Sequence, residues 1–210
     1  MWTRYVALGD SITEGYGDPV DGERLRSWTD WLADDLTRTS PGLAYRNLGL
    51  RASTCRDVLL GQIPAAVGAE PDLVTLTVGA NDALGPDWSV ARFRETFART
   101  LEPLMELGAD VVTYCYPDVG PQLAHAGHRL APAWATYVER TRDANDAIRG
   151  VSAGVGALVL NYERFSPLLD PANISADRIH PNARGYRLAA HEALTRLLAH
   201  YAAPRAPSPS

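Results

Sequence analysis

Residues 73–82 read Leu-Val-Thr-Leu-Thr-Val-Gly-Ala-Asn-Asp, a strongly apolar and β-branched run that ends at a glycine. Its first six residues are apolar or β-branched and carry no charge, which predicts a strand with both faces buried. Gly79 ends the strand, and the polar residues Asn81 and Asp82 follow almost at once. A strand of this kind belongs in a parallel sheet, whose sites form just beyond the carboxyl ends of the strands.

Four other short apolar segments predict further strands: Tyr5–Leu8, Ala44–Leu48, Asp110–Tyr116 and Ala157–Leu160. Longer amphipathic stretches alternate with them. They predict helices that begin near Ser27 and near Ser89, and helices over Arg56–Val67, Trp134–Ile148 and Arg184–Tyr201. This alternation predicts parallel strands with helical crossovers on both faces of the sheet.

Local signals predict details of these helices. Ser27 with Asp30 three residues later makes a capping arrangement, and Ser89 is expected to cap the next long helix. We expect an interruption near Pro64, and Pro103 should kink or end its helix. Helical spacing predicts that one helix faces inward with Tyr137, Val138, Thr141, Ala144 and Ile148. In the last helix it marks one stripe of Leu188, His191, Leu194 and Leu198.

The composition is ordinary for a globular protein. The chain has 210 residues, which suits a single domain over residues 1–202, and the Pro/Ser-rich tail 203–210 is predicted to be disordered. The net charge is -5 and no basic stripe is visible, so nucleic acid is not an expected partner. No apolar run reaches membrane-spanning length.

The cysteines and the first residues of the chain indicate the cellular compartment of the protein. Cys55 and Cys115 lie far apart and form no metal-binding pair, so buried free thiols are expected. The first residues lack the basic head and longer apolar stretch of a signal peptide. Together these features predict a protein of the reduced cytoplasm.

Polar segments follow four of the predicted strands directly: Gly-Asp-Ser at 9–11, Asn-Leu-Gly-Leu-Arg-Ala-Ser at 47–53, Gly-Ala-Asn-Asp at 79–82 and Tyr-Pro-Asp at 116–118. The carboxyl ends of parallel strands share one edge of the sheet. We therefore expect these four segments to meet there.

Ser11 follows Gly9 and Asp10 at the end of the first strand. A serine in this position can expose its hydroxyl, and free N–H groups of a helical turn that begins there could hold a developing oxyanion. The alternative is a turn that merely caps the residues after it. The stretch is not a G-x-S-x-G nucleophile elbow, and it lacks the glycine-lysine ending of a P-loop.

A serine nucleophile needs a base, and His180 is the main candidate. Histidine exchanges a proton near neutral pH, and a carboxylate can fix its tautomer and stabilise the imidazolium. Asp177 lies three residues before His180, so both side chains could reach one point from a single turn. The alternative is a loop histidine that caps the last helix.

Asn81 adds a third candidate group. Its amide offers two donors without charge, which suits the stabilisation of an oxyanion. The alternative is an Asx-turn at the end of a strand. Asp82 is expected to hold the loop through backbone amides and to have no catalytic role.

The four blocks occur in one order over nearly the whole chain: GDS, N-x-G-x-x-small, GAND and D-x-x-H-P. In this order they resemble the blocks of the SGNH (GDSL-type) hydrolase family. The resemblance implies a three-layer α/β/α sandwich with flavodoxin-like topology and a parallel sheet of about five strands. It implies Ser11 as nucleophile, His180 as base and Asp177 as its orienting carboxylate. It also implies oxyanion donors from the backbone of Ser11, the backbone of the second block and the side chain of Asn81.

One position departs from the family pattern. The oxyanion glycine of the family usually falls five residues after the asparagine of the second block, and here that asparagine is Asn47 and the position holds Ala52. Alanine keeps the backbone N–H but adopts a positive φ poorly. Gly49 is the alternative donor if the loop is shifted.

The resemblance predicts an esterase that transfers an acyl group from a small-molecule ester to Ser11 and then to water, a reaction that needs no metal or organic cofactor. An acyltransferase would use the same residues and pass the acyl group to an alcohol or amine. A non-catalytic binding domain is a third reading, against which the intact set of side chains argues. The oligomeric state stays open.

The segment Pro117–Pro132 is long for a loop, and we expect it to be a lid or substrate wall; the alternative is an ordinary surface loop. It contains His125 and His128, which are weaker candidates for ligand contact. His191 and His200 lie in a helical pattern and are expected to be packing or surface groups.

Overall fold

The computed structural model describes residues 2–19, 25–118, 120 and 134–202. In this part of the chain five strands form one sheet: β1 (Arg4–Gly9), β2 (Ala44–Asn47), β3 (Leu73–Thr77), β4 (Asp110–Cys115) and β5 (Leu158–Asn161). All neighbours are parallel, in the order β2-β1-β3-β4-β5. This order is the flavodoxin-like one, which confirms the predicted fold class.

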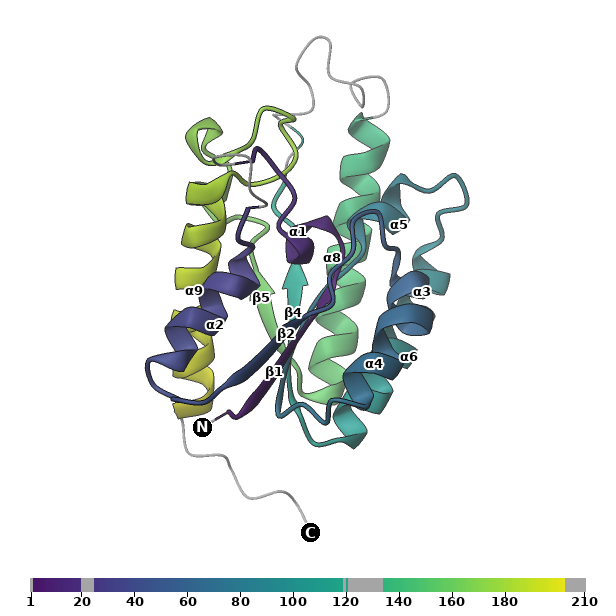
Figure 1. Cartoon of the computed structure of the whole chain (residues 1–210). Coiled ribbons are helices and arrows are strands. Elements are labelled where there is room, and N and C mark those ends of the chain that lie inside the picture. The colour runs from purple at the N-terminus through teal and green to yellow at the C-terminus, as the bar shows by residue number, and fades with distance from the viewer. Residues whose placement is uncertain (1, 20–24, 119, 121–133, 203–210) are drawn as a thin grey trace.

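Helices cover both faces of the sheet (Figure 1). On one face α2 (Trp28–Thr37) and α9 (Ala183–Ala202) share a buried cluster with the strands. On the other face α6 (Val90–Glu106) and α8 (Trp134–Val155) pack over a second cluster. The short helices are α1 (Ser11–Glu14), α3 (Cys55–Asp57), α4 (Ile63–Val67), α5 (Ala80–Leu84), η3 (Ser166–Leu168) and η4 (Pro171–Asn173); α3 and α4 add buried residues to the second cluster.

Two helices begin as their caps predict. The Ser27 side chain accepts from the backbone of Asp30, and the Asp30 carboxylate accepts from the backbone of Ser27, so the capping box of α2 is complete. The side chain of Ser89 accepts from the backbone of Arg92 at the start of α6. The five residues predicted to face inward from α8 are all buried, and α8 continues past Ile148 to Val155.

The helix over 56–67 is interrupted before Pro64, by the π-helical turn η1 (Val58–Gln62). The backbone N–H of Ile63 donates to the carbonyl of Val58, five residues earlier. Pro64 has no N–H for the usual bond to Leu60, so the bonding shifts here.

Pro103 does not end its helix, because α6 continues to Glu106. The expectation of a boundary at this position was therefore wrong. Leu101 and Leu104 flank the proline and are fully buried, and the proline stands only three residues from the end of the helix. Packing on both sides outweighs the one backbone bond that proline removes.

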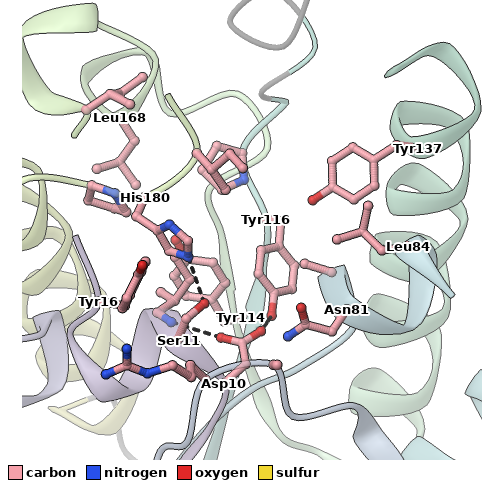
Figure 2. Close-up of a pocket in the computed structure, with 18 residues that line it drawn as sticks. Asp10, Ser11, Tyr16, Asn81, Leu84, Tyr114, Tyr116, Tyr137, Leu168 and His180 are labelled. Carbon is pink, nitrogen blue, oxygen red and sulfur yellow. Dashed lines mark hydrogen bonds between the residues drawn. The ribbon is translucent and has the colours of Figure 1, made fainter. Parts of the chain in front are cut away.

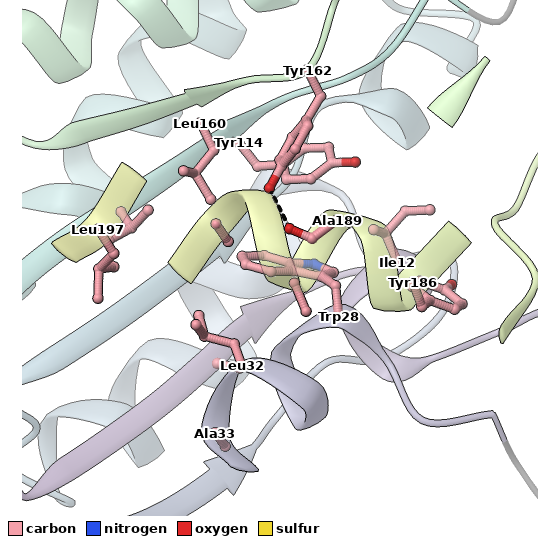
Figure 3. Packing of buried hydrophobic residues seen from close by; sticks show 14 of the residues in the cluster. Ile12, Trp28, Leu32, Ala33, Tyr114, Leu160, Tyr162, Tyr186, Ala189 and Leu197 are labelled. Atoms are coloured by element: carbon pink, nitrogen blue, oxygen red, sulfur yellow. Dashed lines mark hydrogen bonds between the residues drawn. The ribbon is translucent and has the colours of Figure 1, made fainter. Parts of the chain in front are cut away.

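The predicted stripe of α9 is only partly right, because Leu194 packs against the buried cluster while two of its other members do not. His191 is exposed and Leu198 is 43% exposed, whereas the buried residues are Tyr186, Ala189, Ala190, Ala193 and Leu197. The alanines let α9 lie close to α2 and to the aromatic residues of the sheet (Figure 3). Tyr162 fills this interface and donates from its hydroxyl to the carbonyl of Ala189 at 2.7 Å.

Two predicted features lie largely outside the described residues. The tail 203–210 is one, and of the segment 117–132 only Pro117, Asp118 and Gly120 are described. Within the described part of the chain, no helix combines the length and the apolar character needed to cross a membrane.

Candidate active site

Ser11 stands at the carboxyl end of β1, next to the middle of the sheet. Gly9 has a φ of 144°, and a Cβ there would lie 2.3 Å from the carbonyl oxygen of Thr77, so only glycine fits. The carboxylate of Asp10 accepts from the amide of Ile12 at 3.0 Å and caps α1. This cap begins the helix at Ser11, so its backbone N–H has no partner inside the helix.

His180 approaches Ser11 from the far end of the chain (Figure 2). Its Nε2 lies 2.8 Å from Ser11 Oγ, and its Nδ1 lies 2.6 Å from Oδ2 of Asp177. The turn that carries it is closed by the amide of Ser175, which donates to the carbonyl of His180 at 2.8 Å. The structure thus brings the three residues predicted as a triad into one hydrogen-bonded chain.

Asp177 is held in place by its own turn. Its Oδ1 accepts from the backbone amides of Ile179 at 2.9 Å and His180 at 3.0 Å. Burial acts to raise the pKa of Asp177, but the bonds from the His180 side chain and from these two amides outweigh it and lower the pKa to about 2. The group beside His180 is therefore a carboxylate at neutral pH, and it can fix the ring and stabilise an imidazolium.

Ala52 lies in the second block and lines the same cavity as Ser11. Its φ is 63°, so this alanine has the left-handed conformation that the family's glycine would adopt freely. From Leu48 to Thr54, all the backbone N–H groups except that of Ala52 donate to an acceptor on the protein. Among the described residues, only the N–H of Ala52 in this run has no acceptor.

Gly49, the alternative donor, has a different role. Its N–H donates to the side chain of Asn47 at 2.8 Å. A Cβ on Gly49 would lie 2.6 Å from the backbone nitrogen of Glu14, so the glycine permits close contact between this loop and α1. The N–H of Gly49 is therefore already hydrogen-bonded to Asn47, while the N–H of Ala52 can donate to a ligand.

Asn81 and Asp82 lie in α5, just after β3. The amide of Asn81 donates to the carbonyl of Ser53 at 3.0 Å, and the residue lines the cavity. An asparagine amide has two hydrogens, so one remains for a ligand. Asp82 accepts from the backbone of Cys55 at 3.0 Å and holds the second block, as predicted. Burial raises its pKa.

These residues border a cavity of about 230 Å³. Figure 2 shows Tyr16, Leu168 and His180 on one side of it, and Leu84, Tyr116 and Tyr137 on the other. Most of the lining side chains are apolar or aromatic. The full set is Asp10, Ser11, Ile12, Tyr16, Arg51, Ala52, Ala80, Asn81, Leu84, Tyr114, Tyr116, Pro117, Tyr137, Leu168, Ile174, Ile179, His180 and Pro181.

Sequence reasoning missed the partner of Asp10. The hydroxyl of Tyr116 donates to Oδ2 of Asp10 at 2.5 Å, and both residues are buried. Burial raises the pKa of Asp10 to about 6, although the bonds from Tyr116 and from the amide of Ile12 oppose the shift. The signal was the position of Tyr116 directly after the fourth strand, but nothing in the sequence connects it to Asp10.

The remaining candidates lie elsewhere. His191 and His200 are exposed on α9, so of the two predicted roles, packing or surface, they have the second. His125 and His128 are outside the described residues. Cys55 is a buried free thiol, as predicted, and so is Cys115. Burial raises the pKa of each to about 12.

Comparisons with known proteins place the chain among GDSL-like hydrolases. The profile of the GDSL-like lipase/acylhydrolase family matches residues 7–188. A GDSL-like esterase of Mycobacterium tuberculosis is 35% identical over 201 residues, which cover 88% of this chain. The matched part is 58% of that relative, so this chain spans well under two thirds of its length.

Solved structures share the fold. A lipase/acylhydrolase from Enterococcus faecalis superposes with a TM-score of 0.73 at 24% identity, over 94% of this chain and 96% of its own. The esterase EstA from Pseudoalteromonas sp. superposes with a TM-score of 0.72 at 16% identity, over 95% of this chain and 99% of its own. The profile match and the Mycobacterium relative show that the chain belongs to the GDSL-like lipase/acylhydrolase family.

Proposed function

We propose that this protein hydrolyses carboxylic esters through an acyl-enzyme on Ser11. The observation that carries the proposal is the hydrogen-bonded chain from Asp177 through His180 to Ser11 Oγ, with distances of 2.6 Å and 2.8 Å. A serine hydroxyl is a weak nucleophile until a neighbouring base takes its proton. Here the base is oriented by a group that is a carboxylate at neutral pH.

The first half of the reaction acylates the serine. Ser11 Oγ attacks the ester carbonyl carbon while its proton passes to His180 Nε2. The carbonyl electrons move to oxygen, and the backbone N–H groups of Ser11 and Ala52 and the Asn81 amide are the donors that meet this oxyanion. When the intermediate collapses, the C–O bond to the alcohol breaks, and the alcohol oxygen takes the proton from Nε2.

The second half returns the enzyme to its starting state. Water gives a proton to His180 Nε2 and attacks the acyl carbon, and the bond to Ser11 Oγ then breaks. The acid leaves, and Ser11 regains its proton. An alcohol or amine in place of water would give acyl transfer, so the product formed in the presence of added alcohols separates the two activities.

The cavity favours a small acyl group. Its volume of about 230 Å³ lies below the roughly 300–1,000 Å³ typical of drug-sized ligands. The apolar lining, with Leu84, Leu168 and Ile174 among it, suits a short aliphatic acyl chain. A series of aryl esters from acetyl to long acyl chains should therefore show the highest kcat/KM at the short end.

Turnover by Ser11→Ala tests the proposal. The variant should keep its thermal stability and lose activity by on the order of 10³-fold or more, because the nucleophile is gone. Ser166→Ala is the matched control, since Ser166 is an exposed serine outside the cavity, and it should retain full activity. A Ser11→Ala protein with unchanged turnover would refute the assignment.

A further inference from the structure

The turn that carries Ala52 is built for a glycine and yet holds an alanine. The amide of Ser53 donates to the carbonyl of Leu50 at 3.2 Å, which closes a four-residue turn with Ala52 third in it. A φ of 63° at this position is the geometry that type II turns reserve for glycine or asparagine. An alanine stays there only if the surroundings hold it.

The contact that can hold it comes from Glu14. This residue ends α1, the helix that begins at Ser11. Oε2 of Glu14 accepts from the backbone amide of Arg51 at 2.6 Å, and Oε1 accepts from the Arg51 guanidinium at 2.6 Å and 3.0 Å. One carboxylate thus accepts hydrogen bonds from both the main chain and the side chain of Arg51, the residue directly before Ala52.

Arg51 is also connected to His180 through Tyr16. The Arg51 guanidinium lies over the ring of Tyr16, 4.6 Å from its centroid. The Tyr16 ring meets the His180 ring edge-on at 4.9 Å. The ion pair therefore links three parts of the site: the helix of the nucleophile, the turn of Ala52 and the aromatic neighbour of His180.

We propose that Glu14 and Arg51 are positioning residues that hold Ala52 in its left-handed conformation, so that its N–H faces the oxyanion. The inference rests on the proposed function, in which this N–H is a donor. The Arg51 side of this ion pair is 57% exposed, so solvent screens the attraction and its contribution to stability is small. Its effect here is on orientation: without it the alanine relaxes toward negative φ, and its N–H turns away from the cavity.

A double-mutant cycle with Ala52→Gly tests the proposal, because glycine adopts a positive φ without help. In the natural background, Glu14→Ala should lower kcat by about tenfold to 10²-fold with little change in KM, somewhat less than the 10²–10³ typical of a lost oxyanion donor. In the Ala52→Gly background, the same change should cost less than about threefold. Glu14→Gln should fall between, since its amide oxygen can still accept from the Arg51 backbone.

Arg196→Ala is the control, because it removes an ion pair to Glu192 on α9, and neither residue borders the cavity. It should leave kcat unchanged. Equal losses from Glu14→Ala in both backgrounds would overturn the proposal, and so would a loss confined to KM or an inactive Ala52→Gly. A protein that turns over esters with Ser11→Ala in place would instead refute the proposed function, so the two failures are distinct.

Discussion

At the scale of single residues, the site concentrates backbone strain. Among the described residues three non-glycines have a positive φ, and two of them belong to the site: Ala52, at 63°, lines the cavity, and Arg178, at 61°, lies between Asp177 and His180. The third is Glu70, outside the cavity. The left-handed conformation costs a non-glycine residue roughly 1–2 kcal/mol. Such strain persists only where the surrounding bonds determine the conformation, as the Asp177 turn does with two backbone amides.

Asp177→Asn probes the orienting carboxylate. Asparagine has a similar shape and can cap the turn, but it has no charge for the imidazolium and can favour the wrong tautomer. We expect kcat to fall by up to about 10⁴-fold, the loss known for this change in serine proteases. His180→Ala should be at least as damaging. Near-normal kcat in Asp177→Asn beside an inactive His180→Ala would reduce the site to a dyad.

At the scale of elements, the π turn η1 supports the turn that carries Ser11. It places the buried side chain of Gln62 against Gly9: the amide of Gly9 donates to Oε1 of Gln62, and Nε2 donates back to the carbonyl of Gly9, both at 2.8 Å. The carbonyl of Gly9 also accepts from the backbone N–H of Leu50, so it keeps a partner without Gln62. The N–H of Gly9 donates to Gln62 and would lose this acceptor.

Gln62→Leu should therefore destabilise the fold and disturb the site together. A buried N–H left without a partner costs about 1–3 kcal/mol in the free energy of unfolding, which urea titration measures. Leu60→Ala on the same turn is the control, since Leu60 is 64% exposed and its loss should cost less than about 0.5 kcal/mol. Equal free energies of unfolding in the two variants would contradict this role for η1.

The elements also show what a sequence can and cannot predict. The strands and capped helices follow from local patterns, so β3 and the start of α2 were predictable. The buried face of α9 was not, because alanines rather than leucines make the close contact with α2. Hydrophobicity alone favours leucine, whereas the packing selects small residues.

At the scale of the whole molecule, the site joins distant parts of the chain. Ser11 and His180 are 169 residues apart, and family blocks made their meeting predictable. Asp10 and Tyr116 are 106 residues apart and meet because β1 and β4 flank β3 in the sheet. The family resemblance implied that strand order, but nothing in the sequence indicates which side chains meet across it, so this buried contact was not predictable.

The Asp10–Tyr116 contact should affect how global stability depends on pH. The pKa of Asp10 is about 6 in the folded protein against 3.8 in its ordinary state. Between these pH values the unfolded chain has released this proton while the folded protein keeps it, so the free energy of unfolding falls as pH rises and levels off above pH 6.

Melting temperatures from pH 4 to pH 7 measure this contribution. In Asp10→Asn the part of the fall that belongs to Asp10 should vanish, so the profile should be flatter than that of the natural protein. Tyr116→Phe removes a bond that favours the charged form, so its fall should extend to higher pH. Parallel profiles for all three proteins would show that Asp10 does not titrate in this window.

The central claim is that Ser11 is the nucleophile, and the location of a covalent adduct tests it most directly. A phosphonate ester is an electrophile that an activated serine attacks, which leaves a stable covalent adduct on its oxygen. We expect an activated ethylphosphonate ester to inactivate the present protein, with peptide mass spectrometry placing one phosphonate on Ser11 and none in His180→Ala over the same time. An adduct on another residue, or full inactivation with Ser11 unmodified, would contradict the account.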